Sequence, residues 1–393
     1  MKKFLQTNKQ KIVLNEKTIQ LKGVNFGGWL LMEGYILHSL NLAEQVFKKE
    51  FLQKLGVDAL QDFEKSFRDN FICKEDVVRV KKLGANCIRV PFNYRLIEKK
   101  PYEYDLDGLK YLDSILKWAK ELGVWIILDL HAACGAQNND WHSDSLGPAD
   151  LWNKKSCQNR TIALWKFLAN RYKNREELAG YDILNEAVLK DTKLLNDFYR
   201  RVIAGIREED KNHIIFVEGN NWAQDIECLD DFEDDNLVLS VHFYNPLEFT
   251  FNLIPQMHYA KGMFKGMKIV LDGYVKYAKK VQRPIFVGEF GVNAREGYYG
   301  EDKWLKEVLK YFNTAGFHWT YWTYKAIKNT IFPDGVLSYY PNPEWVNRQG
   351  PKLGFATFAD CWPKHKVLMK KSWRSSEFKE NKLIVDALKS ACK

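Results

Sequence analysis

Short apolar runs alternate with amphipathic stretches along most of this chain. The runs are rich in Val, Ile, Leu and Phe and several end in a polar residue, which is typical of parallel strands covered on both faces. Between them, apolar residues recur at helical spacing; over 107–122 they form one stripe, and Gly123 ends the helix. Strand-like runs occur at 22–29, 85–92, 124–131, 181–186, 213–219, 237–244, 284–290 and 317–324.

Eight strands alternating with helices define the expected fold. Repeated βα units predict a parallel sheet, and eight of them predict closure into a barrel, so the fold class is α/β, a (β/α)8 TIM barrel. Such a barrel needs about 250 residues. The remainder is expected in a long insertion after the first strand at 35–72, with helical patterns near 42–55 and 58–70, and in a tail from 326.

A single domain over 1–393 is expected, because no stretch has the composition of a linker. Its core covers about 20–325, and the C-terminal extension 326–393 packs on the barrel. The extension reads as an irregular, aromatic-containing segment to about 372, followed by a helix near 376–391.

Composition narrows the classes of protein. The formal net charge of +9 comes largely from dispersed lysines, which favours a solvated surface over nucleic-acid binding. No window approaches the ~18 apolar residues of a membrane span, and residues 1–10 precede no apolar signal segment, so a cytoplasmic protein is expected. Seven scattered cysteines indicate reduced thiols, and the absence of Cys or His clusters argues against a metal site.

Two predicted strands end in a glutamate. Asn185-Glu186 ends the fourth strand, and Glu289 ends the seventh between two glycines. Either could be a surface residue in a salt bridge, but in a barrel the carboxyl ends of the strands open onto one face. Glycoside cleavage needs two such carboxyl groups; a separation of about 5–5.5 Å gives retention of configuration, and about 6.5–9.5 Å gives inversion.

Further polar and aromatic residues stand on the same strands. Arg89 and Tyr244 could donate hydrogen bonds that keep one glutamate ionised, while the other stays protonated in a less compensated setting. Arg89 could equally be a buried arginine neutralised by a nearby acid, and His131 a hydrogen-bonded structural residue. Asp129 is expected to make a hydrogen bond inside the barrel. Structural or surface positions are expected for His142, His258 and His318.

Six short motifs carry a resemblance to a known family. Each is weak alone, but in this order and at strand ends they are specific. They are Ile88-Arg89-Val90-Pro91, Leu128-Asp129-Leu130-His131, Leu184-Asn185-Glu186, Val241-His242-Phe243-Tyr244, Val287-Gly288-Glu289-Phe290-Gly291 and Trp319-Thr320-Tyr321-Trp322. Over about 20–325 the chain resembles the family-five glycoside hydrolases of the retaining barrel clan. The stretches 23–30, 33–35 and 131–138 look like the branch of exo-β-1,3-glucanases and β-glucosidases, and some β-mannosidase-like members look similar too.

The resemblance implies a role for each matched residue. Glu186 would be the acid/base, Glu289 the nucleophile, and Asn185 the contact to the sugar 2-hydroxyl. Trp322 would be the stacking platform; Trp319 competes for that role, but residues three apart in a regular strand point to opposite faces. The residues expected to bind substrate are Arg89, His131, Asn185, His242, Tyr244 and Trp322.

The expected activity is hydrolysis of β-linked glucans or gluco-oligosaccharides by a two-glutamate double displacement, with exo action or a preference for oligosaccharides. No cofactor or metal is expected, and the partner is the oligosaccharide or polysaccharide substrate rather than nucleic acid or a membrane. A β-mannanase or β-mannosidase of the same family, a catalytically silent carbohydrate-binding barrel and a barrel enzyme of another chemistry are the alternatives. The residues leave the sugar, the linkage and the oligomeric state open.

Overall fold

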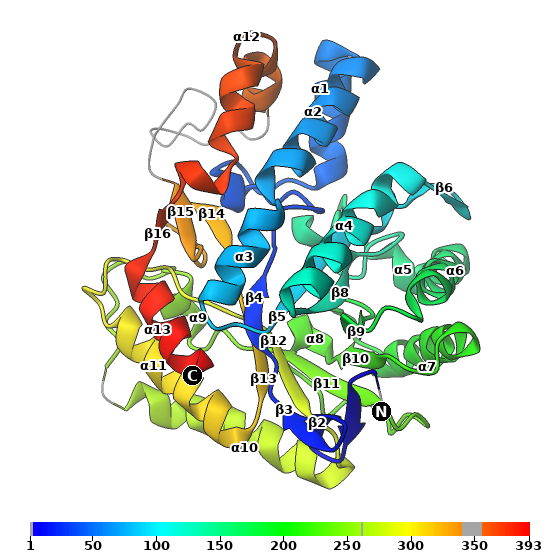
Figure 1. Ribbon diagram of the computed structural model, residues 1–393, viewed down its shortest axis with the longest axis vertical. Coiled ribbons are helices and arrows are strands. Elements are labelled where there is room, and N and C mark those ends of the chain that lie inside the picture. Colours follow the sequence, from blue (N-terminus) through cyan, green and yellow to red (C-terminus); the bar gives the residue numbers. More distant parts are fainter. Residues whose placement is uncertain (1–2, 261, 340–355) are drawn as a thin grey trace.

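Eight parallel strands close into a barrel in the computed structural model, which describes residues 3–260, 262–339 and 356–393 (Figure 1). The predicted α/β barrel is therefore confirmed. In order around the barrel the strands are β4 (Lys22–Asn25), β5 (Cys87–Asn93), β8 (Trp125–Ala132), β9 (Leu178–Asp182), β10 (Ile214–Glu218), β11 (Leu237–His242), β12 (Ile285–Phe290) and β13 (His318–Tyr321).

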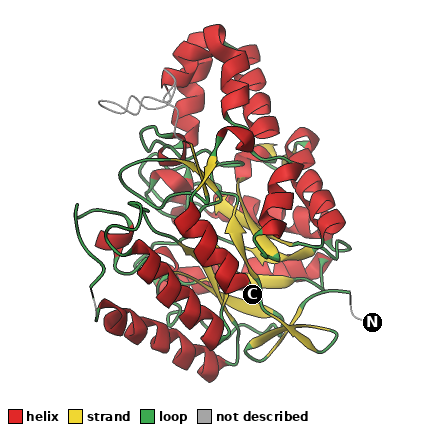
Figure 2. Ribbon diagram, turned by 60° about the vertical axis from the view of Figure 1, so that its left-hand side comes forward, coloured by secondary structure: helices red, strands yellow, loops and turns green. Residues whose placement is uncertain are grey.

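Helices surround the barrel, so its strands are covered on their outer faces (Figure 2). The predicted 107–122 helix is α4; Asp105 caps it by accepting a hydrogen bond from Asp107 N, and Gly123 ends it in the left-handed conformation. The long helices of the ring are α3 (Lys74–Lys82), α4 (Leu106–Leu122), α6 (Lys155–Tyr172), α7 (Thr192–Glu209), α10 (Met263–Val281) and α11 (Glu301–Ala315).

Short elements fill the connections between strands and helices. Those after the barrel strands bear on the site described below. They are η1 (Tyr35–Leu37), η2 (Tyr94–Leu96), β6 (Glu98–Lys100), β7 (Glu103–Tyr104), η3 (Trp141–Ser143), α5 (Asp150–Asn153), α8 (Asn220–Ala223) and α9 (Leu247–Thr250).

An N-terminal antiparallel sheet, unforeseen in the sequence, closes one end of the barrel. Its strands are β1 (Gln6–Asn8), β2 (Lys11–Leu14) and β3 (Lys17–Ile19). Leu5 and Ile12 form one apolar cluster with residues from the N-terminal halves of the barrel strands, among them Cys87, Ile127 and Phe286. This plug keeps water from the N-terminal end and leaves the opposite end free for a site.

The insertion and the tail build a helical module beyond the opposite end of the barrel (Figure 1). It contains α1 (Glu44–Leu55), α2 (Val57–Phe71) and α12 (Ala356–Ser372). Phe63 of α2 packs against Trp362 and Trp373 at ring centroid distances of 5.1 and 5.6 Å.

The expectation of an irregular tail to about 372 is wrong for its described part, because α12 lies there; residues 340–355 of the tail lie outside the described residues. The apolar residues Phe358, Trp362 and Met369 of α12 are buried, and the ring centroids of Phe358 and Trp362 lie 6.0 and 5.1 Å from that of Phe63 in α2; Pro363 lies inside the helix. The rest of the tail contributes β14 (Lys325–Ile327), β15 (Leu337–Tyr339), η4 (Ser375–Glu377), β16 (Lys379–Glu380) and α13 (Lys382–Cys392).

The extension packs on the barrel, as predicted: α13 lies along α11. Within the ranges that the structure describes, no helix combines the length and the apolar character needed to cross a bilayer.

Candidate active site

A cavity of about 440 Å³ opens at the C-terminal ends of the barrel strands. Its walls come from loops that follow the strands, as the barrel topology requires. Six predicted site residues line it: His131, Glu186, His242, Tyr244, Glu289 and Trp322. The other two, Arg89 and Asn185, are fully buried beneath its floor.

Glu186 reaches the cavity through a short irregular segment. The predicted strand 181–186 ends earlier, because β9 stops at Asp182. Beyond it Ile183 N still donates to Phe216 O at 3.2 Å and Asn185 N to Leu130 O at 3.1 Å, so the chain stays docked on both neighbouring strands. Glu186 then adopts a positive φ of 48°, and its N–H donates to Glu218 Oε2 at 2.6 Å.

Glu289 is held from two sides. Arg89 Nη1 donates to Oε1 at 2.8 Å, and the Tyr244 hydroxyl donates to Oε2 at 2.9 Å. These two bonds fix the orientation of the carboxylate at the end of β12. The charge-assisted bond from the arginine is of the stronger kind.

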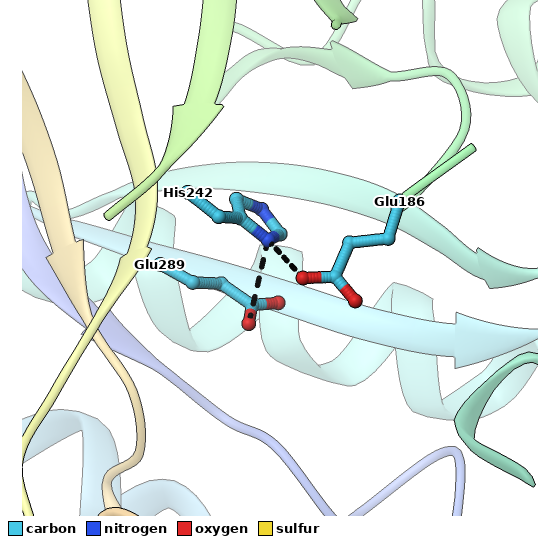
Figure 3. Close-up of side chains that lie close together, drawn as sticks. All are labelled: Glu186, His242 and Glu289. Carbon is cyan, nitrogen blue, oxygen red and sulfur yellow. Dashed lines mark hydrogen bonds and ion pairs between the residues drawn. The ribbon is translucent and has the colours of Figure 1, made fainter. Parts of the chain in front are cut away.

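His242 lies between the two glutamates (Figure 3). Its Nδ1 is 2.6 Å from Glu186 Oε1 and 3.6 Å from Glu289 Oε2, and its Nε2 is 3.2 Å from Glu218 Oε1. Burial by itself would lower the pKa of His242, but Glu218 and Glu289 together with the bond to Glu186 raise that pKa well above its usual range.

The protonation of Glu186 differs from the expectation. Burial opposes its charge, but the hydrogen bond and charge of His242 outweigh burial and lower the pKa of Glu186 to about 2. The expectation that one glutamate stays protonated in a less compensated setting is therefore wrong, because the charge of His242, whose Nδ1 lies 2.6 Å away, favours the ionised form of Glu186. No local pattern indicates this pairing, since His242 lies 56 residues along the chain.

Arg89 is the centre of a buried carboxylate cluster. Its guanidinium lies 3.1 Å from Asp129, 2.8 Å from Asp182 and 3.0 Å from Glu218. One oxygen of each acid lies within 4.8 Å of the others, a spacing that a metal ion could bridge, but the guanidinium already contacts all three. Burial raises the pKa of Asp182 well above its usual range and that of Asp129 to about 7. Both interpretations of Arg89 thus apply, since it is neutralised and also holds Glu289.

Trp322 forms one wall of the cavity. It stacks on His131 with ring centroids 5.3 Å apart and planes 6° apart, and its Nε1 donates to the Tyr35 hydroxyl. Trp319 points the other way, where it packs edge-on against Phe290 and does not line the cavity. Burial lowers the pKa of His131 to about 3, so the ring is neutral at neutral pH.

Asp129 accepts a hydrogen bond from His131 Nδ1 at 2.7 Å, inside the barrel. Asn185 is fixed in turn by Arg89 Nη2, which donates to its Oδ1 at 2.9 Å. The side chains at the floor are therefore connected in one hydrogen-bonded network.

Several lining residues were not anticipated as site residues. Glu33 is buried; burial, reinforced by nearby carboxylates, raises its pKa well above the usual range, and its Oε1 lacks a hydrogen-bond partner among the described residues. The position of Glu33 just after the first predicted strand was the signal in the sequence that could have marked it as a site residue.

His142 corrects another expectation. It lines the cavity with Nε2 3.5 Å from Glu186 Oε2, so a structural or surface role is wrong for it. His318 is buried and accepts a hydrogen bond from Leu21 N at 3.0 Å, whereas His258 packs on Tyr299; neither lines the cavity.

An aromatic rim closes the cavity laterally. Phe332 contacts Tyr35 and Phe251 at ring centroid distances of 4.8 and 5.2 Å, which joins the loops after β4, β11 and β14. Trp222 Nε1 donates to Asp140 Oδ2 at 2.8 Å and joins the loops after β8 and β10. We refer to Tyr35, Asp140, Trp222, Phe251 and Phe332 as the rim.

An eight-stranded barrel that brings two glutamates together at its carboxyl face has the site of a glycoside hydrolase. The chain belongs to glycosyl hydrolase family 5: the family described as "Cellulase (glycosyl hydrolase family 5)" matches residues 52–327. The predicted family is thus confirmed, and the protein is a glycosidase.

Similar proteins span several activities. A β-xylosidase of Phanerodontia chrysosporium is 32% identical over 341 residues, covering 82% of this chain and 71% of the relative. Endoglucanase C of Acetivibrio thermocellus is 26% identical, covering 79% and 92%. A probable glucan 1,3-beta-glucosidase A of Aspergillus fumigatus is 27% identical, covering 69% and 64%. An endoglucanase structure from Thermotoga maritima matches with a TM-score of 0.64 at 21% identity, covering 94% and 96%.

Proposed function

We propose that this protein is a retaining β-glycoside hydrolase that cleaves β-linked glucans or gluco-oligosaccharides. The observation that carries the proposal is the close approach of the two carboxyl groups: an oxygen of Glu186 and one of Glu289 lie within 4.8 Å. This spacing is close to the ~5–5.5 Å typical of retaining enzymes and falls short of the ~6.5–9.5 Å that an inverting enzyme needs.

The two steps follow from the contacts of each glutamate. In the first, Glu289 attacks the anomeric carbon, and the glycosidic oxygen leaves with a proton from Glu186. Glu186 receives that proton from the imidazolium of His242 across their 2.6 Å hydrogen bond, so Glu186 is a carboxylate and His242 is neutral when the first step ends. In the second step Glu186 takes a proton from water and passes it back to His242, the resulting hydroxide attacks the anomeric carbon, and the bond to Glu289 breaks.

The remaining predicted residues would hold the sugar and the nucleophile. Arg89 and Tyr244 position Glu289 through the bonds described above. Asn185, whose oxygen is occupied by Arg89, would use its amide N–H toward the sugar 2-hydroxyl. His131 and His242 would line the subsite of the cleaved sugar, with Trp322 as the platform under its ring.

Exo action, or a preference for short substrates, is supported by the rim. A cleft for a long polymer needs two open ends, whereas loop contacts join the segments on both sides of this cavity. Its volume of about 440 Å³ lies toward the lower end of ligand pockets, at ~300–1,000 Å³. Efficient internal cleavage of a long polymer would contradict this part of the proposal.

Glucose is proposed because relatives named as an endoglucanase and a glucan glucosidase match most of the chain. A mannoside-cleaving enzyme is the second candidate, since a structural neighbour from Thermotoga maritima has been solved in complex with mannotriose as substrate. The relative named a β-xylosidase adds a pentose to be tested.

The test is a product analysis on laminari-, cello-, manno- and xylo-oligosaccharides, with Glu186→Ala and Glu289→Ala beside the wild type. We expect the wild type to release a monosaccharide from one series, and the NMR spectrum to show the β-configured product first. Both variants are expected to lose this release. Turnover of no series with sugar binding intact would favour a silent binding barrel, and an α-configured first product would overturn retention.

A further inference from the structure

The two carboxylate oxygens of Glu186 face different imidazoles. Oε1 is bonded to His242, as Figure 3 shows, and Oε2 lies 3.5 Å from Nε2 of His142. His142 belongs to η3 in the loop after β8, whereas His242 ends β11. The carboxylate is thus flanked by basic groups from two separate elements of the barrel.

The rim holds His142 in this position. Its Nε2 is also 3.5 Å from Asp140 Oδ2, the oxygen that accepts the 2.8 Å hydrogen bond from Trp222. The side chain is only 13% exposed, and it packs edge-on against Trp141 with ring centroids 5.4 Å apart. His142 is therefore fixed between the rim and the acid/base glutamate.

The groups that face His142 are mostly acidic. They are Asp140 from its own loop, Glu186 from the segment after β9 and Glu289 from β12; His131 of β8 lies with its ring centroid 6.1 Å away. Burial alone would lower the pKa of His142, but the bond to Asp140 and the charge of Glu186 raise it. The neutral ring of His131 adds no opposing charge near pH 7.

We propose that His142 is a positioning residue for the acid/base: its imidazolium steadies Glu186 at Oε2 and favours the carboxylate form in both steps of the reaction. This inference rests on the proposed role of Glu186. His142 keeps its own proton throughout, while Glu186 gives one to the leaving oxygen and later takes one from water.

The effect on pH dependence has a defined sign. Removing a positive charge beside Glu186 makes the glutamate hold its proton more tightly. The basic limb of kcat/KM, where the acid is lost, then moves to higher pH. For a substrate with an activated aryl leaving group, the acid limb of kcat, where the base becomes protonated, moves in the same direction.

The expected shift is about one pH unit, the lower end of the ~1–3 units that an opposite charge within 4–6 Å produces, because the pocket is open to water. A residue that only contacts substrate, or only supports the loop, would change KM or stability and leave both limbs in place.

The test compares pH profiles of the wild type, His142→Gln and His142→Lys on an aryl glycoside of the sugar identified by product analysis. His258→Gln is the matched control, since His258 lies outside the cavity. We expect both limbs to shift upward in His142→Gln, to return toward the wild type in His142→Lys, and to stay unchanged in the control. Unshifted limbs in His142→Gln would overturn the proposal.

A second measurement depends neither on enzymatic activity nor on whether a His142 variant folds. The ring resonances of His142, in protein labelled with ¹³C-histidine, are titrated by NMR in the wild type and in Glu186→Gln. Loss of the carboxylate is expected to lower the pKa of His142 by about one unit. An unchanged titration would refute the coupling, whereas a shifted titration in a protein without hydrolytic activity would refute the proposed function alone.

Discussion

Replacing Tyr244 by phenylalanine removes one hydroxyl group and almost no volume. That hydroxyl donates to Glu289 Oε2 at 2.9 Å, while the other carboxylate oxygen remains bonded to Arg89 at 2.8 Å. Oε2 is thus the oxygen that the variant leaves without its donor. A hydrogen bond to a charged group contributes about 1.5–3 kcal/mol, which corresponds to a decrease in kcat/KM of about 10- to 150-fold.

Steady-state kinetics on an aryl β-glycoside measure the effect, and burst kinetics separate formation of the glycosyl-enzyme from its hydrolysis. Tyr277→Phe is the matched control, because the Tyr277 hydroxyl donates to the carbonyl of Leu229 at 2.9 Å, outside the cavity. That variant is expected to lose about 1 kcal/mol of stability with unchanged kcat/KM. Equal kcat/KM for Tyr244→Phe and the wild type would refute Tyr244 as a support of the nucleophile.

Three further changes test other parts of the structure. Trp322→Leu is expected to lower kcat/KM about tenfold, a loss of ~1.4 kcal/mol of ring contact, whereas Trp319→Leu lowers the melting temperature and leaves kcat/KM within about twofold; the reverse pattern would move the platform to Trp319. Asp129 has a folded pKa of about 7, so its protonated form stabilises the fold below pH ~3.8 and this contribution is lost as pH rises toward 7. Asp129→Asn should therefore raise the melting temperature relative to wild type more at pH 7 than at pH 4, and a constant difference would contradict that. Phe63→Ala should cost about 3–5 kcal/mol in the free energy of unfolding, measured by denaturant titration, and a loss under about 1 kcal/mol would show that α1, α2 and α12 contribute little to global stability.

The barrel could be predicted because its strands are buried on both faces and therefore read as continuous apolar runs. Polar residues that interrupt such runs, such as Glu289 and Arg89, are visible for the same reason. The ends of the strands are predicted less accurately than their existence. The β9 strand ends at Asp182, but the backbone remains hydrogen-bonded to the neighbouring strands as far as Asn185, so the apolar pattern continues beyond the strand.

Contacts between loops could not be predicted in the same way. His142 reaches Glu186 only because the loop after β8 bends over the cavity and is tied there by Trp222. Nothing in the local sequence specifies that bend. The α12 helix was not predicted for a related reason. Its apolar face packs against α1 and α2, which lie about 300 residues earlier in the chain, so the local sequence does not show what covers it.

The balance of charge at the floor bears on the chemistry of the site. Arg89 and the imidazoliums of His242 and His142 face the carboxylates of Glu186, Glu218 and Glu289 together with two further aspartates. Five acids therefore face three cations among the described residues, and burial raises the pKa values of the two aspartates, which lessens the excess of negative charge. A negative potential at the anomeric carbon stabilises the positive charge of an oxocarbenium-like transition state. Because these carboxylates are fixed by the barrel before substrate binds, that stabilisation requires no rearrangement during the reaction.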